Sequence, residues 1–176
     1  MKKALLLFTT LSFFALPNAT KAASDIEVAG DVIQVLIPSI AYGATLYLDD
    51  DEGEMQMYKS FASTFLITHA VKRTVNKQRP NGGDHSFPSG HTSAAFQGAA
   101  FIHARYGSTY AIPAYVAATF VGYSRVESKN HYTTDVIAGA ALGTACSFYV
   151  TEPNQDYVVQ PIADNGNYGL QVSGIW

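Results

Sequence analysis

Residues 72–91 read KRTVNKQRPNGGDHSFPSGH, a basic stretch that runs into a Pro/Asn/Gly turn and then into a Ser-Gly-His sequence. Lys72 and Arg79 are seven positions apart, about two turns of an α-helix, so both side chains are predicted to project from one helix face. Pro80 and the turn residues after it should end that helix. Taken alone, two cations at this spacing also fit an ordinary basic helix surface.

Pro88-Ser89-Gly90-His91 predicts the start of the next helix. Ser89 is a good N-cap, and Gly90 lets the backbone come close to a ligand. The unpaired N–H groups of a helix start, helped by the helix dipole, favour a bound anion. His91, in the first turn, is placed to protonate a group bound there. In isolation the pattern also fits a capped helix with an incidental histidine.

A third stretch has Ser124-Arg125, five residues, His131, three residues and Asp135. Arg125 offers a planar fork of donors suited to phosphate oxygens. His131 and Asp135 are predicted neighbours on one helix face, so the carboxylate can hold one ring nitrogen and free the other for nucleophilic attack. Such a pair alone is usually a surface hydrogen bond. All three stretches together predict a phosphate-binding catalytic site.

Hydrophobic periodicity predicts an all-α helical bundle. The five expected segments are Val28–Leu48 (broken at Pro38), Glu54–Arg79, Ser89–Tyr106, Thr109–Val126 and His131–Val150. In the second segment an amphipathic face, rather than a lipid-embedded cylinder, is predicted from Tyr58, Phe61, Ala62, Phe65, Leu66 and His69. Gly139 and Gly143 form a small-xxx-small pair that lets another helix approach closely.

The end of the chain changes character. Two alternating segments, 157–163 and 168–176, flank Asp164-Asn165-Gly166-Asn167, a good turn sequence. They predict a short C-terminal β-hairpin, which we expect to cover the bundle or to mediate formation of a homo-oligomer. Tyr168, Leu170, Val172 and Trp176 should share one of its faces.

The N-terminus has the pattern of a secretory signal peptide, with two lysines, an apolar run and a small-residue cleavage zone. The expected organisation is a signal peptide at 1–23, a helical phosphatase domain at 24–150 and a hairpin extension at 151–176. Export to the periplasm or cell envelope of a bacterium follows. The longest uncharged segments contain polar residues and proline, and mean hydropathy is only +0.05. A soluble or peripherally membrane-associated protein is therefore favoured over an embedded one.

Charge distribution argues against a nucleic-acid partner. Without Lys2, Lys3 and Lys21, eight basic residues stand against 14 acidic ones, a formal net charge of -6 instead of -3. Five of those eight basic residues lie in or beside the proposed site: Lys72, Arg73, Lys77, Arg79 and Arg125. In an acidic chain, basic residues concentrated in one place predict a local anion-binding site rather than an extended nucleic-acid surface.

The three stretches resemble the signature of the type 2 phosphatidic acid phosphatase superfamily, which includes bacterial acid phosphatases, membrane lipid phosphatases and vanadium haloperoxidases. The resemblance covers Lys72 to Asp135 and includes every motif position. It implies a helical bundle and a two-step mechanism through a phosphohistidine, without metal or cofactor. The N-terminal part is short for this family, and the C-terminal hairpin lies outside the signature.

Carried over by position, the resemblance assigns three catalytic residues: His131 attacks phosphorus, Asp135 orients it, and His91 protonates the leaving oxygen and later activates water. It assigns phosphate binding to Lys72, Arg79, Ser89, Gly90 and Arg125.

The sequence thus predicts a phosphatase that hydrolyses phosphate monoesters, of small molecules or of lipids, including isoprenoid diphosphates. Two alternatives stay open at this point. One is a vanadate-dependent haloperoxidase, because the same site can hold vanadate. The other is a non-catalytic envelope protein that binds lipid phosphates, although such a protein has no use for a nucleophile and its orienting carboxylate.

Overall fold

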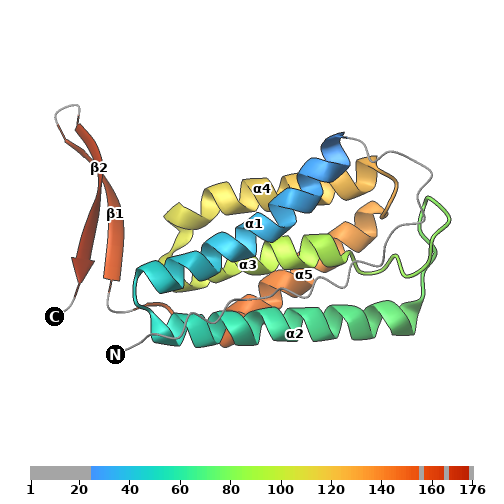
Figure 1. Cartoon of the computed structure of the whole chain (residues 1–176), viewed down its shortest axis with the longest axis horizontal. Helices are drawn as coiled ribbons and strands as arrows, with labels where there is room; N and C mark the ends of the chain where they lie inside the picture. Colours follow the sequence, from blue (N-terminus) through green and yellow to red (C-terminus); the bar gives the residue numbers. More distant parts are fainter. Residues whose placement is uncertain (1–24, 155–156, 165–166, 175–176) are drawn as a thin grey trace, which may run out of the picture.

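The computed structural model describes residues 25–154, 157–164 and 167–174. The predicted signal peptide lies outside these residues. Five helices make up the body of the molecule (Figure 1). Their bounds are α1 Asp25–Tyr47, α2 Asp51–Val75, α3 Gly90–Tyr106, α4 Ser108–Glu127 and α5 Thr133–Val150.

Helix α3 is the centre of the bundle and contacts the other four helices. Close approach depends on small residues, as the glycine pair on α5 predicts. A Cβ at Gly139 would overlap the carbonyl oxygen of Ser89, the N-cap of α3, and a Cβ at Gly143 would overlap that of Ser93 on α3. The two core clusters are likewise rich in alanine, with Ala95, Ala99 and Ala118 in one and Ala41 and Ala111 in the other.

Two predicted helix bounds are wrong in ways that matter for the site. Helix α2 ends at Val75, because Asn76 takes a left-handed conformation (φ 43°) and its N–H bonds to the Lys72 carbonyl. Arg79 is therefore in a loop and does not share a helix face with Lys72. Helix α5 begins at Thr133, so His131 also precedes its helix. Pro38, in contrast, lies inside α1 without breaking it.

The side of α2 that packs against the bundle is largely polar. Four of the α2 residues that point into the bundle are polar: Gln56, Ser60, Thr64 and Thr68. Ser60 Oγ lies 2.7 Å from Ser147 Oγ, and Thr68 Oγ1 donates to Ser93 Oγ at 3.0 Å. The large apolar side chains of α2 are exposed instead: Met55, Phe65, Leu66, Ile67 and Val75. Hydrophobic spacing alone located a face of the helix but could not tell which way it points.

The predicted fold class needs a correction at its C-terminal end. The fold is all-α, and every residue of the two core clusters comes from a helix. The predicted inclusion of a β-hairpin in the fold class is not supported, because the two C-terminal strands pair only with each other among the described residues. Strands β1 (Tyr157–Asp164) and β2 (Asn167–Gly174) pair antiparallel with each other beyond the bundle (Figure 1). The predicted shared face of the hairpin concerns side chains outside those that the structure describes.

Helix α1 is long and apolar enough to cross a membrane, by length and composition, and only 28% of its most apolar window is buried inside the molecule. It is the one such helix among the described residues.

The motifs meet at one end of the bundle. The end of α2 and the loop after it, the start of α3, and the α4–α5 connection all lie at this end, together with the first turns of α1 (Figure 1). One backbone hydrogen bond joins two motifs directly, because Ser89 N–H donates to the Asp135 carbonyl at 2.9 Å. Within the third motif, His131 N–H donates to the Arg125 carbonyl at 3.1 Å.

Candidate active site

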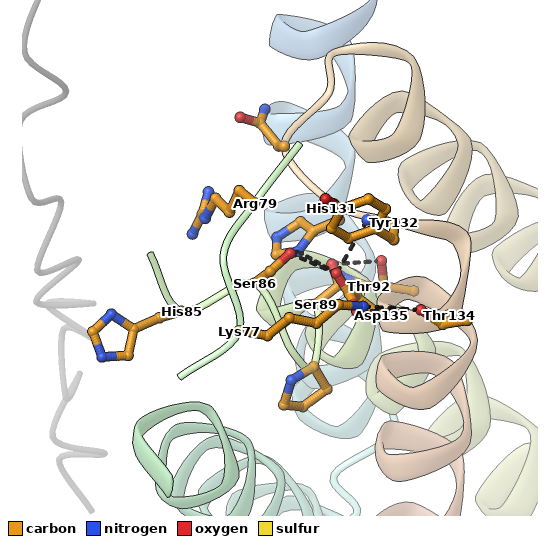
Figure 2. A network of polar contacts seen from close by, with 12 residues as sticks. Lys77, Arg79, His85, Ser86, Ser89, Thr92, His131, Tyr132, Thr134 and Asp135 are labelled. Carbon is orange, nitrogen blue, oxygen red and sulfur yellow. Dashed lines mark hydrogen bonds and ion pairs between the residues drawn. The ribbon is translucent and has the colours of Figure 1, made fainter. Parts of the chain in front are cut away.

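His131 and Asp135 are linked through a third side chain rather than by the direct bond that the sequence predicts. His131 Nδ1 is 3.9 Å from Asp135 Oδ2. Ser86 Oγ, however, donates to Asp135 Oδ2 at 2.5 Å and lies 3.4 Å from His131 Nδ1. Figure 2 shows Ser86 beside both residues. Because the Ser86 hydroxyl donates its hydrogen bond to Asp135, its oxygen can accept a hydrogen bond from His131 Nδ1–H. The other ring nitrogen of His131, Nε2, then has a free lone pair.

Asp135 is fixed by several donors. Lys77 Nζ lies 2.7 Å from Oδ1, and the Tyr132 N–H donates to Oδ2 at 3.1 Å. Burial by itself would raise the pKa of this carboxyl, but the hydrogen bonds from Lys77, Ser86 and Tyr132 outweigh it and hold the pKa below its usual value. Asp135 is thus an ionised anchor, and Lys77 also lies over the Tyr132 ring.

His131 is held in its neutral form. Its side chain is 2% exposed, and burial, together with the positive charges of Arg79 and Lys72, lowers its pKa to about 3. A neutral imidazole has a lone pair to offer an electrophile, so this environment suits a nucleophile at any pH well above 3.

Lys72 reaches the loop between α2 and α3 from the last turn of α2. Its Nζ donates to the carbonyls of His85 and Pro88 at 2.7 and 2.8 Å. Burial and the nearby charge of Arg79 lower its pKa to about 8. Lys72 therefore both fixes this loop and places a positive charge near His131.

Arg79 lies in the same loop, with Nε donating to the Asp84 carbonyl at 3.0 Å. Its pKa is lowered by burial and by the charge of Arg125, so the two guanidinium groups are close enough to repel each other. A bound anion would relieve the repulsion between these two positive charges. This is the electrostatic condition that the sequence predicts for a phosphate site.

Arg125 is engaged by α1 in this structure. Its guanidinium, 2% exposed, donates to Asp31 and to the Glu27 carbonyl, each at 2.6 Å, and to Ser124 Oγ at 3.1 Å. The close approach of α1 requires Gly30, where a Cβ would overlap Ser124 Oγ and crowd Arg125 Nη2.

The start of α3 follows the prediction. Ser89 caps the helix by accepting a hydrogen bond from Thr92 N–H at 3.4 Å, and its hydroxyl also meets Thr92 Oγ1 at 2.9 Å. Gly90 is the first helical residue. His91 Nε2 lies 3.1 Å from Asp31 Oδ1. His85, in contrast, points away from His131 and Asp135 (Figure 2).

The structure thus gathers all eight predicted site residues at one end of the bundle, although not with the predicted contacts. Sequence reasoning missed two contributors, Ser86 and Asp31. Ser86 carried no signal beyond its position next to Phe87. Asp31 did carry one, because it is the sole charged residue between Val28 and Leu48.

Comparison with known proteins bears out the resemblance. Residues 81–156 match the model of the PAP2 superfamily. This part of the chain is similar to that superfamily. The match begins just after Lys72 and Arg79 and includes the other two motifs.

The chain is also similar to individual proteins. It is 40% identical over 81 residues to a lipid A 1-phosphatase of Porphyromonas gingivalis, which covers 44% of this chain and 18% of that protein. It is 28% identical over 131 residues to a lipid A 1-phosphatase of Helicobacter pylori, covering 69% and 65% of the two chains. The chain therefore spans less than two thirds of the length of these relatives.

Two solved structures resemble the bundle. The crystal structure of a transmembrane PAP2 type phosphatidylglycerolphosphate phosphatase from Bacillus subtilis matches with a TM-score of 0.55 and 28% identity over 71% of each chain. The structure of Aquifex aeolicus LpxE matches with a TM-score of 0.56, covering 71% of this chain and 91% of that one. At 19% identity, this second likeness concerns the fold.

Proposed function

We propose that this protein is a metal-independent phosphatase that removes the phosphate of a lipid phosphomonoester through a phosphohistidine on His131. The observation that carries the proposal is the neutral, buried His131, anchored through Ser86 to Asp135 and surrounded by the charges of Lys72 and Arg79.

In the first step, the free ring nitrogen of His131 attacks phosphorus while the bond to the leaving oxygen breaks and His91 gives that oxygen a proton. Lys72, Arg79 and Arg125, with Ser89 and the Gly90 amide, bind the phosphoryl oxygens. In the second step His91 takes a proton from water, which attacks phosphorus and releases phosphate from His131. Charge-assisted hydrogen bonds contribute about 1.5–3 kcal/mol each, so three cations can supply much of the charge stabilisation.

A lipid leaving group is supported by the outer surface of the bundle. Large apolar side chains are exposed on α2 and also on α1, α4 and α5, where Ile40, Val116 and Ile137 are each more than 60% exposed. Exposed apolar surface over several helices marks a protein or membrane contact. The named relatives act on lipid phosphates according to their printed names. Envelope localisation and contact with a lipid surface are part of this proposal.

The experiment compares phosphate release from phosphatidic acid in detergent micelles with release from a soluble aryl phosphate. We expect turnover of the lipid, inhibition by vanadate and no inhibition by EDTA. His131→Ala should lose turnover and keep its helical circular dichroism. Phosphate binding without turnover by the wild type would instead support a binding protein, and inhibition by EDTA would contradict the metal-independent mechanism.

A further inference from the structure

Asp31 lies on α1, outside all three motifs, yet its carboxylate contacts two of the proposed site residues. Oδ1 is 2.6 Å from Arg125 Nη1 and 3.1 Å from His91 Nε2. The side chain is about one-third exposed and stands in an otherwise uncharged run from Val28 to Leu48. A charged side chain in so apolar a segment is costly unless it is paired, and here it is paired twice.

The two ring nitrogens of His91 have different surroundings. Nε2 meets Asp31, whereas Nδ1 forms no hydrogen bond with any residue in the described part of the chain. A carboxylate against one nitrogen fixes the orientation of an imidazole. Nδ1 is then the ring atom left to deliver a proton.

Arg125 stabilises this arrangement from the other side. Its buried guanidinium shares the same carboxylate oxygen as His91, and an adjacent positive charge favours the ionised form of Asp31. Further hydrogen bonds to the Glu27 carbonyl and Ser124 fix the guanidinium itself. The carboxylate is thus held between Arg125 of α4 and His91 of α3.

We infer that Asp31 is a positioning residue that orients His91 for protonation of the leaving group; this inference rests on the proposed phosphatase function. The Nδ1–H proton of His91 passes to the leaving oxygen as the phosphorus–oxygen bond breaks. Neutral His91 then accepts a proton from the water that attacks the phosphohistidine, which restores the starting pair with Asp31.

Dependence on the leaving group tests this role. General acid catalysis matters little for a good leaving group and is worth about 10²–10⁴-fold when proton transfer is needed. For Asp31→Asn we expect kcat/KM to fall about threefold or less with the most acidic phenol in an aryl phosphate series, and on the order of 10²-fold with the least acidic phenol. An unchanged slope of log kcat/KM against leaving-group pKa would overturn the inference.

Two further variants separate positioning from structure. Glu27→Gln removes a negative charge one turn earlier on α1 and should keep the wild-type slope. In a His91→Gln background, Asp31→Asn should not change the slope any further, because its effect on the leaving group passes through His91, whereas its contact with Arg125 affects every member of the series alike. A further change of slope in that background would contradict the inference. If Asp31→Asn does not fold, Asp31→Ser gives the same slope measurement.

The inference and the proposed function fail in different ways. Wild-type protein that releases no phosphate from any member of the series would refute the phosphatase. Active wild type with an unchanged slope in the Asp31 variants would refute only the role of Asp31.

Discussion

Lys72 loses its positive charge at a lower pH than an ordinary lysine, because burial and the charge of Arg79 lower its pKa to about 8. As pH rises through this value the free enzyme loses a phosphate-binding cation, so kcat/KM should decline above about pH 8. Lys72→Arg should move this decline to higher pH, because the guanidinium stays charged. The measurement is a pH profile of kcat/KM between pH 5 and 10. If the pH profile has the same shape in both proteins, Lys72 does not bind the phosphate.

Ser86 is the residue on which the orientation of His131 depends, since Nδ1 is 3.9 Å from the carboxylate of Asp135 but 3.4 Å from the serine oxygen. Ser86→Ala removes this bridge, and kcat should fall on the order of 10²-fold, the usual cost of a misplaced reacting group. Ser39→Ala, which removes an exposed hydroxyl bonded to its own helix, is the control. Wild-type kcat in Ser86→Ala would show that Asp135 orients the ring unaided.

At the scale of helices, the packing of α5 on α3 depends on glycine. In Gly143→Ala the new methyl group would overlap the Ser93 carbonyl, so the helices must separate, at a cost of about 1–3 kcal/mol in the free energy of unfolding. Gly43→Ala is the matched control, because a Cβ there meets nothing within 4 Å. It should be neutral or stabilising by up to about 1 kcal/mol. Equal stability of both variants in urea denaturation would contradict this packing.

The helices and the site were predictable to different degrees. Hydrophobic periodicity and proline placed five helices close to their actual positions. These signals could not place the end of α2, because that helix is capped by Asn76 in a left-handed conformation, with no proline at that position to indicate the end. For the same reason Lys72 and Arg79 meet through a loop and not along a helix. The contacts of Asp31 could not be predicted either, since they depend on how α1 packs against α4.

At the scale of the whole molecule, the exposed apolar side chains should direct the protein to lipid. Phe65 and Leu66 are 52% and 66% exposed on α2, about two turns before Lys72. The double variant Phe65→Ser/Leu66→Ser should lose vesicle binding and activity on vesicular phosphatidic acid, while activity on a soluble aryl phosphate stays within about twofold. Lys59→Ser, an exposed polar position on the same helix, is the control. Equal losses of activity on both substrates would show that Phe65 and Leu66 are needed for folding and not for lipid binding.

Trapping the covalent intermediate tests the central claim most directly. The purified protein is mixed with substrate for a single turnover, quenched in alkali, and digested for mass spectrometry of the peptide that contains residue 131. We predict a phosphorylated His131 that forms and decays with turnover and is absent from His131→Ala. Full turnover with His131 never phosphorylated, or with the modification on another residue, would contradict the account.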